Sequence, residues 1–342
     1  MSDITKWFKT NDSYVKPAEK SPQVICFKYF YVSWKSNKDY KVEWRNTKPE
    51  KYNYEKVVTL RLTGESITFI GNIMYDSTCI SNINASKNYT SPNSQFLKSH
   101  LQKCIRRGLG HKAMITTFLL IEQDPVSLLR RLPIIVLEDV HIVKDLDILI
   151  WFMVMSQYIN LPESFKNWVI YFTKFISEYP KKNYYNKDIE NIDYSGLNKI
   201  PLEFRSTLYA LIVRISYGGM KGDMKFLKYI VNDWIKKINL GSKLTIMRPK
   251  TVVITKTLEP GMYEKSALDF HCYRKILNQI NEQYSQFDLL TIKKTIWEKS
   301  SKINWRESQT VSDNTINECW EVIKSDLYKI QKQVIKKWVW KC

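Results

Sequence analysis

Short apolar runs separated by turn residues fill the first part of the chain. Between Gln23 and Ser77 these runs are rich in Val, Ile, Thr, Tyr and Phe, a composition typical of β-strands. They read VICFKYFYVSW, DYKVEWR, KVVTLRLTG and SITFIGNIMY. Thr63-Gly64-Glu65 fits a hairpin turn between the last two runs. This region predicts a small antiparallel sheet of roughly three to five strands.

Helical periodicity takes over from residue 94. The predicted helices up to residue 240 are Ser94–Arg107, Lys112–Glu122, Pro125–Leu137, Lys144–Tyr158, Glu163–Glu178, Leu202–Tyr217 and Met220–Asn239. Those beyond it are Ala267–Tyr284, Asp288–Ser300 and Asn314–Lys341. The weakly periodic segments 78–94 and 241–265 are predicted linkers, and the second is compatible with a short strand.

These patterns predict a mainly α (α+β) fold, with a small N-terminal antiparallel β subdomain followed by an α-helical array. The predicted divisions are a polar arm over 1–20, a β subdomain over 21–80, a helical domain over 94–240 and a C-terminal helical region over 241–342. The long last helix carries one apolar stripe of Ile316, Trp320, Ile323, Leu327, Ile330, Val334 and Trp338. The stripe covers only about three heptads, which favours a core-facing helix over a coiled-coil partner surface.

Composition adds a strong positive charge to this picture. Hydrophobic residues make up 44% of the 342 positions, so the chain can bury a sizeable core and is not a disordered tail. The 53 Lys and Arg residues against 34 Asp and Glu residues give a formal net charge of +19. Self-repulsion of this size is relieved by a polyanion, which favours nucleic acid, DNA above all, as the partner over a merely solvated Lys-rich surface.

The cysteine spacing and the polar first residues indicate an intracellular protein, cytoplasmic or nuclear. The six cysteines are scattered without a C-x-x-C pair, and the first residues are polar, unlike a signal peptide. The longest apolar stretch, Ile148–Met155, is too short to span a bilayer, and no lipidation motif is present. We therefore expect no membrane partner.

Residues 94–112, SQFLKSHLQKCIRRGLGHK, form the most basic acid-free stretch of the predicted helical domain. An apolar stripe at Phe96, Leu97, Leu101 and Ile105 predicts one packed face. The other face carries the predicted phosphate contacts Lys98, Lys103, Arg106, Arg107 and Lys112. Such a face binds nucleic acid in a salt-dependent and sequence-tolerant way, although an ordinary solvated helix face has the same composition.

The next segment resembles the helical region behind the ATPase core of the clamp-loader-like, replication-associated recombination ATPases. In that family a basic Ile-Arg-Gly turn and a helix precede Asp-Pro, four residues, Arg-Arg-Leu, five residues and Glu-Asp. This chain has Ile105-Arg106-Arg107-Gly108, Asp124-Pro125, Arg130-Arg131-Leu132 and Glu138-Asp139, with the last two spacings intact. A softer likeness continues through Leu161-Pro162-Glu163 to residues 179–183, so that the resemblance covers residues 94–183.

The chain departs from this family in one decisive motif. No G-x-x-x-x-G-K-[ST] sequence is present, and the predicted β subdomain stands where the family has its ATPase. We infer that ATP hydrolysis is missing and that only the helical module is shared. In the family this module belongs to the lid and the oligomerisation part, so the resemblance implies a homo-oligomer.

The paired charges of this segment predict an internal network. Arg131 and Glu138 lie two turns apart if the helix is unbroken, although Pro133 is also suited to the first turn of a new helix. An Arg–carboxylate network of Arg130, Arg131, Glu138 and Asp139 that holds helices in register is the favoured interpretation, ahead of phosphate contact by either arginine.

Other candidate sites are weaker. Tyr217-Gly218-Gly219-Met220-Lys221 is a glycine-rich segment at which Lys221 and backbone N–H groups suit a phosphate, although a tight helix–helix turn is favoured. The C-terminus is the second basic stretch, with Lys332, Lys336 and Lys337 as candidate phosphate contacts. A metal site is the remaining hypothesis, with candidate ligands Asp139, His141, Asp269 and His271.

The function expected from these patterns is a non-catalytic nucleic-acid-binding accessory protein of genome replication, repair or packaging, without a cofactor. Two alternatives remain open at this point. One is a metal-dependent nuclease built on the Asp and His pairs. The other is a structural or assembly protein that binds a partner chain through its C-terminal helix.

Overall fold

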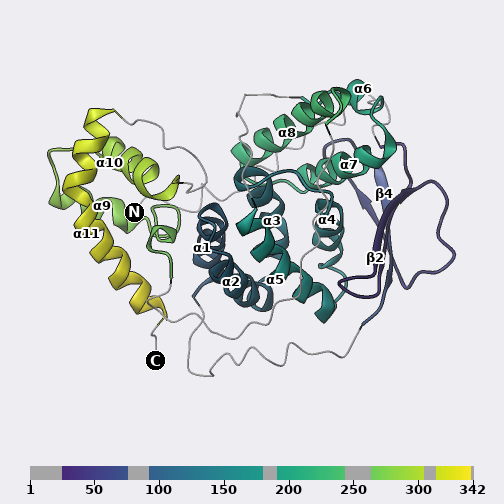
Figure 1. Ribbon diagram of the computed structural model, residues 1–342, viewed down its shortest axis with the longest axis horizontal. Coiled ribbons are helices and arrows are strands. Elements are labelled where there is room, and N and C mark those ends of the chain that lie inside the picture. The colour runs from purple at the N-terminus through teal and green to yellow at the C-terminus, as the bar shows by residue number, and fades with distance from the viewer. Residues whose placement is uncertain (1–24, 76–91, 180–190, 243–262, 304–312, 340–342) are drawn as a thin grey trace.

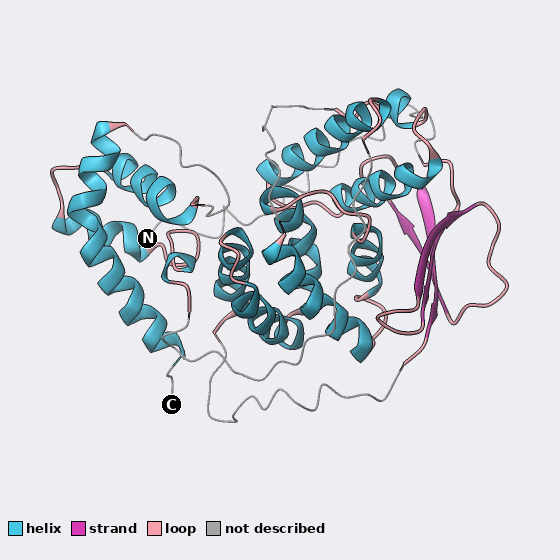
Figure 2. Ribbon diagram, viewed as in Figure 1, coloured by secondary structure: helices cyan, strands magenta, loops and turns pink. Residues whose placement is uncertain are grey.

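A computed structural model describes residues 25–75, 92–179, 191–242, 263–303 and 313–339. Helices make up most of it, and a small sheet covers one end (Figures 1 and 2). The predicted class, an N-terminal sheet followed by an array of helices, is confirmed. The predicted polar arm and most of both predicted linkers lie outside the described residues, as does the end of the family resemblance after residue 179.

The sheet consists of two hairpins placed side by side. β1 (Tyr29–Trp34) pairs antiparallel with β2 (Tyr40–Arg45), and β3 (Tyr54–Thr59) pairs antiparallel with β4 (Ser66–Ile73). The order β2-β1-β4-β3 places β1 and β4 together in parallel. The prediction of an antiparallel sheet is therefore wrong at its centre, because side-chain patterns within a strand do not record the direction of the neighbouring strand.

The predicted hairpin turn at Thr63-Gly64-Glu65 is confirmed. The Leu60 N–H donates to the Glu65 carbonyl at 2.7 Å, and the Gly64 N–H donates to the Leu60 carbonyl at 2.8 Å. These bonds close the turn between β3 and β4 and set the register Val58 to Ile67.

One face of the sheet packs against the helices through aromatic rings. Phe30 on β1 stacks on Trp44 on β2 with ring centroids 4.2 Å apart. Trp151 from the helical layer donates its indole N–H to the Phe30 carbonyl at 3.0 Å. A Cβ atom at Gly71 of β4 would lie 2.8 Å from the Trp151 ring, so only glycine permits this close approach. The sheet and helices therefore share one main core.

The helices up to residue 239 build most of the rest of that main core, to which Ala267, Leu268 and Ile335 also belong. Their bounds are α1 (Ser94–Arg106), α2 (Gly110–Gln123), α3 (Pro125–Asp139), α4 (Leu146–Met155), α5 (Glu163–Glu178), α6 (Tyr194–Leu197), α7 (Leu202–Ser216) and α8 (Lys221–Asn239). The short α6 was not predicted, and α3 runs unbroken through Pro133. All ten residues of α4 are buried. No helix in the described part of the chain is both long and apolar enough to cross a membrane.

Residues 263–303 and 313–339 form the C-terminal unit, at the left of Figure 1. It contains η3 (Lys265–Ala267), α9 (Lys275–Gln283), α10 (Leu289–Ile296), the π-helical η4 (Trp297–Ser301) and α11 (Asn314–Val339). The predicted helix Ala267–Tyr284 is wrong in its first half, because Ala267 and Leu268 belong to the main core and turns follow them before α9 begins.

The C-terminal unit has a small core of its own. Its buried members are Ile276, Ile280, Ile292, Ile296, Cys319, Ile323 and Leu327. The predicted stripe of α11 faces inward, with Ile323 and Leu327 in this second core and Trp338 packed against the main core. This confirms a core-facing helix, in which Trp320, Ile330, Val334 and Trp338 of the stripe are partly buried.

Candidate functional site

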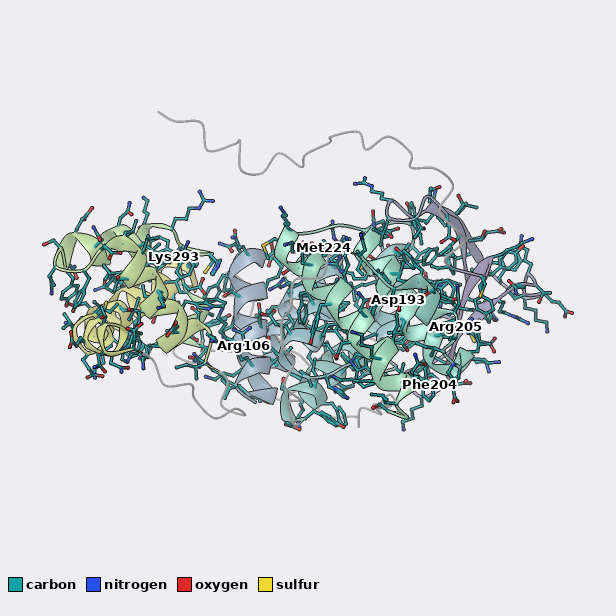
Figure 3. All side chains as sticks on the ribbon, turned by 90° about the horizontal axis from the view of Figure 1, so that it is seen from above. Arg106, Asp193, Phe204, Arg205, Met224 and Lys293 are labelled. Carbon is teal, nitrogen blue, oxygen red and sulfur yellow. The ribbon has the colours of Figure 1, made fainter. Side chains whose placement is uncertain are left out.

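Helix α1 lies between the helices of the main core and the C-terminal unit (Figures 1 and 3). The Asn93 side chain accepts the Phe96 N–H at 2.9 Å and begins the helix. Gly108, with φ of +70°, ends it, and the Leu109 N–H donates to the Cys104 carbonyl at 2.9 Å. The helix thus packs its apolar stripe into the main core and directs basic side chains toward the C-terminal unit.

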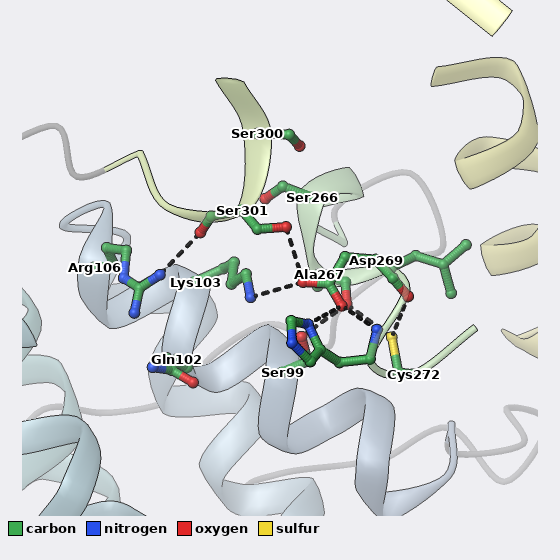
Figure 4. A network of polar contacts seen from close by, with 12 residues as sticks. Ser99, Gln102, Lys103, Arg106, Ser266, Ala267, Asp269, Cys272, Ser300 and Ser301 are labelled. Carbon is green, nitrogen blue, oxygen red and sulfur yellow. Dashed lines mark hydrogen bonds and ion pairs between the residues drawn. The ribbon is translucent and has the colours of Figure 1, made fainter. Parts of the chain in front are cut away.

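Arg106 is the most extensively bonded of these basic side chains. Its Nε donates to Asp139 Oδ1 at 2.6 Å, and its Nη2 donates to Glu138 Oε1 at 3.2 Å. The remaining Nη1 donates to the Ser301 carbonyl at 2.9 Å. Only 4% of Arg106 is exposed. One guanidinium therefore joins α1, α3 and η4, and Figure 4 shows its bond to Ser301.

Arg107 and Lys103, which flank Arg106, also form ion pairs with carboxylates. Arg107 forms an ion pair with Glu264 and donates from Nη2 to the Ser300 carbonyl at 2.6 Å. Lys103 Nζ lies 3.2 Å from Asp269 Oδ2. Burial lowers the pKa of both cations, and the neighbouring carboxylate charge opposes this in each case.

Asp269 accepts hydrogen bonds in addition to its ion pair with Lys103. The Ser301 hydroxyl donates to its Oδ2 at 2.8 Å, and the His271 backbone N–H donates to its Oδ1 at 2.9 Å. Burial alone would raise the pKa of Asp269, but the hydrogen bonds from His271 and the charge of Lys103 hold it below its usual value. Asp269 is therefore an ionised anchor within the C-terminal unit.

These contacts correct the predicted role of α1. Lys103, Arg106 and Arg107 are buried against carboxylates and carbonyls, so they do not present a phosphate-binding face. Lys98 and Lys112 are half-buried near the two ends of the same segment and remain candidates. This arrangement could not be predicted from the sequence, because the acidic partners lie 32 to 166 residues away along the chain.

The predicted arginine–carboxylate network is present, and it also includes Asp223 of α8 and Arg106 of α1. Arg131 lies 2.9 Å from Asp223 on α8 and 4.0 Å from Glu138. Asp139 bonds to Arg106, which links the two halves of the motif that resembles the recombination ATPases. Arg130 donates to the Tyr217 carbonyl at 3.1 Å instead of joining a carboxylate pair of the motif.

The glycine-rich segment after α7 is a tight turn held by arginines. Gly218 has φ of +67°, and Arg214 donates to its carbonyl at 2.9 Å. The turn leads directly into α8, whose first residue, Lys221, is exposed. Lys221 therefore stays a candidate phosphate contact, while the turn itself is explained by helix packing.

The predicted metal ligands do not converge. Asp139 bonds to Arg106 and Asp269 to Lys103, while His141 packs against Trp234 with centroids 5.2 Å apart. The closest predicted pair is His271 Nδ1 and Asp269 Oδ1 at 3.1 Å. Across the residues that the structure describes, no group of three or more His, Cys, Asp or Glu side chains is arranged to hold a metal ion. The hypothesis of a four-residue metal site is therefore wrong.

A group of exposed lysines lies on α11. Lys332, Lys336 and Lys337, which we call the lysine ridge, are all exposed. Lys329, one turn earlier, pairs with Asp326 at 2.8 Å. Lys265 of η3 lies 5.3 Å from the ring centroid of Tyr328, one turn before Lys332, and adds a cation from a second segment.

A groove missed by the sequence analysis opens elsewhere on the C-terminal unit. It has a volume of about 360 Å³ and is lined by Phe270, His271, Leu290, Lys293, Lys294 and Trp297. The Phe270 and His271 rings lie 4.3 Å apart, and His271 meets Trp297 edge-on at 5.8 Å. Asp269-Phe270-His271 was visible in the sequence, but its partners from α10 and η4 follow only from the fold.

No protein-family model, curated protein or solved structure matches this chain.

Proposed function

We propose that this protein is a non-catalytic nucleic-acid-binding accessory of genome replication, repair or packaging, with DNA as the favoured ligand. The lysine ridge carries the proposal. Its three ammonium groups are exposed, and no carboxylate of the described residues is recorded within ion-pair distance of them. They are therefore available to phosphates, whereas the cations of α1 are already neutralised.

The arrangement of the ridge suits a phosphate backbone. Lys332 and Lys336 lie one helical turn apart on the same side of α11, and Lys337 is adjacent. Such contacts bind without reading sequence and weaken as salt rises, because binding releases counterions. The overall charge of +19 acts in the same direction by attracting a polyanion over a longer range.

The family resemblance gives the proposal its biological setting. The Asp-Pro, Arg-Arg-Leu and Glu-Asp residues resemble the helical module of recombination ATPases that act at stalled replication forks. Here Asp124 caps α3 by accepting the Ser127 N–H at 3.1 Å, so the motif begins a real helix. We propose a role beside such forks without ATP hydrolysis, and the homo-oligomer implied by the resemblance is testable by sedimentation.

The test is a fluorescence-anisotropy titration with single-stranded and duplex oligonucleotides across a salt series. Replacing Lys332, Lys336 and Lys337 by Gln should reduce the slope of log affinity against log salt by about 2 to 3. The matched control replaces Lys28, Lys38 and Lys51, exposed lysines near the sheet, by Gln and removes the same charge. Absence of binding by the native chain at low salt, or equal losses in both triple variants, would contradict the proposal.

A further inference from the structure

We propose that the groove of the C-terminal unit receives an unpaired base of a single-stranded nucleic acid together with its phosphate. This inference rests on the proposed function and adds a preference for single strands. About 360 Å³ is near the lower end of small-ligand sites and offers room for one nucleotide. In a duplex both faces of a base are covered by its neighbours, so only an unpaired base can enter and stack.

The base-binding part of the groove is aromatic. Phe270 comes from the turn before α9 and Trp297 begins η4, and both rings line the same opening. Leu290 of α10, which is 77% exposed, adds an apolar side chain to the lining of this opening. Aromatic faces accept every base because each base has a π-face.

The phosphate-binding part is cationic. Lys293 and Lys294 of α10 are both exposed and line the groove, and Lys293 Nζ lies 5.4 Å from the Phe270 centroid. Lys294 lies 3.3 Å from Asp313, but both side chains are more than half exposed, so this pair exchanges readily for a phosphate. Charge and stacking surface are therefore adjacent, as in single-strand binding proteins.

His271 adds a directed polar group. Its Nδ1 lies 3.1 Å from the ionised Asp269, which favours the tautomer with the proton on Nδ1. This leaves Nε2 of a 58% exposed ring to accept a hydrogen bond from an amino group of a base.

The buried cations of α1 position this groove. Arg107 and Arg106 hold the Ser300 and Ser301 carbonyls at the end of η4, the element that Trp297 begins. Lys103 holds Asp269 (Figure 4). Asp269 in turn orients His271. The basic helix thus acts on the ligand through the groove and is not a contact surface itself.

The experiment compares three labelled ligands of equal length by anisotropy, with free phosphate as an unlabelled competitor. The ligands are a dT strand, the same strand with abasic positions, and a duplex. The native chain should bind the dT strand more tightly than the abasic strand. Trp297→Leu keeps an apolar side chain without a stacking face. It should lower dT affinity about 5- to 100-fold and leave abasic and duplex affinities within about 2-fold.

Trp320→Leu is the matched control, because Trp320 is a half-buried aromatic of the same unit that does not line the groove. It should preserve the ratio of dT to abasic affinity. Should Trp297→Leu fail to fold, Lys293→Gln provides the second variant, with an expected fall of about 0.7 in the salt slope for the dT strand and the abasic strand alike.

The outcomes separate the two proposals. Binding to no strand at all contradicts the proposed function, and with it this inference. Equal affinity for dT and abasic strands, or a Trp297→Leu variant with native dT affinity, overturns the inference alone and leaves backbone binding by the lysine ridge intact.

Discussion

Two basic stretches of this chain resemble each other in sequence and have opposite environments. On α1 and at its C-cap, Lys103, Arg106 and Arg107 are at most 8% exposed, and each bonds to a carboxylate. On α11, the lysine ridge is exposed to solvent. The difference arises because α1 is packed on both sides, by the main core and by the C-terminal unit, whereas α11 has one outer face.

The buried cations of α1 do not contribute to the net charge of the protein surface, because each is paired with a carboxylate. The three ion pairs Lys103–Asp269, Arg106–Asp139 and Arg107–Glu264 each sum to zero, so the surplus of 19 positive charges belongs to the rest of the chain. A buried cation must be paired because desolvation is costly, while an exposed lysine keeps its hydration and costs little. Density of Lys and Arg in sequence therefore does not measure charge that a polyanion can reach.

The largest expected effect is a loss of stability on removal of a buried cation of α1. Arg106→Met removes hydrogen bonds to Glu138, Asp139 and Ser301 and leaves the buried Asp139 carboxylate without its guanidinium. Loss of one partner of a buried pair should lower the free energy of unfolding by about 3 to 5 kcal/mol. Urea denaturation followed by circular dichroism measures this change.

Two further variants sharpen this measurement. Arg106→Met combined with Asp139→Asn should recover part of the loss, because no charged carboxylate is then stranded. Lys336→Met, the same kind of change on the exposed ridge, should alter the unfolding free energy by less than about 0.5 kcal/mol. Equal costs for Arg106→Met and Lys336→Met would show that α1 is not an internal anchor.

The same contrast explains how far the sequence could be interpreted. Local signals placed helices well: Glu163–Glu178 is predicted and observed with the same bounds, and Asp124 begins α3 as its type suggests. Contacts between segments far apart in the sequence could not be predicted. The parallel pairing of β1 with β4 and the bond between Arg106 and Asp139 depend on segments that meet only after folding.

For the candidate site, too, local features could be predicted and contacts between distant segments could not. Basic segments and the Asp269-Phe270-His271 run were visible as residue types, but their exposure was not. Hydrophobic periodicity shows which face of α1 is apolar, yet it cannot show that its polar face is also covered. The groove was missed because its walls come from the turn at Phe270 and His271 and from the helical segment of α10 and η4, which meet only after folding.

A smaller effect is expected from the histidine of the same buried helix. The Glu264 N–H donates to His100 Nε2 at 2.9 Å, and His100 Nδ1 lies 2.8 Å from the Thr116 hydroxyl. Burial, with a lesser contribution from the Lys112 charge, lowers the pKa of His100 from its ordinary 6.5 to about 3. The unfolded chain then takes up a proton below pH 6.5 that the folded chain does not, so stability falls as the pH falls.

The expected size is about 2 kcal/mol between pH 6.5 and pH 5. His100→Gln removes the titrating group, so the difference between its unfolding free energies at these two pH values should be smaller by that amount than in the native chain. Denaturant titrations at both pH values provide the comparison. An unchanged difference would mean that His100 is not held neutral between α1 and the C-terminal unit.

The smallest expected effect compares one lysine from each stretch. Lys337→Gln on the ridge should change the unfolding free energy by less than about 0.5 kcal/mol. It should lower the salt slope of binding by about 0.9 for a duplex and about 0.7 for a single strand. Lys103→Gln leaves the buried Asp269 without its ammonium and should cost at least about 1 kcal/mol of stability, while the salt slope stays the same. If instead Lys103→Gln lowers the salt slope and Lys337→Gln does not, α1 rather than α11 meets the phosphates, because only a cation that exchanges counterions with the ligand contributes to that slope.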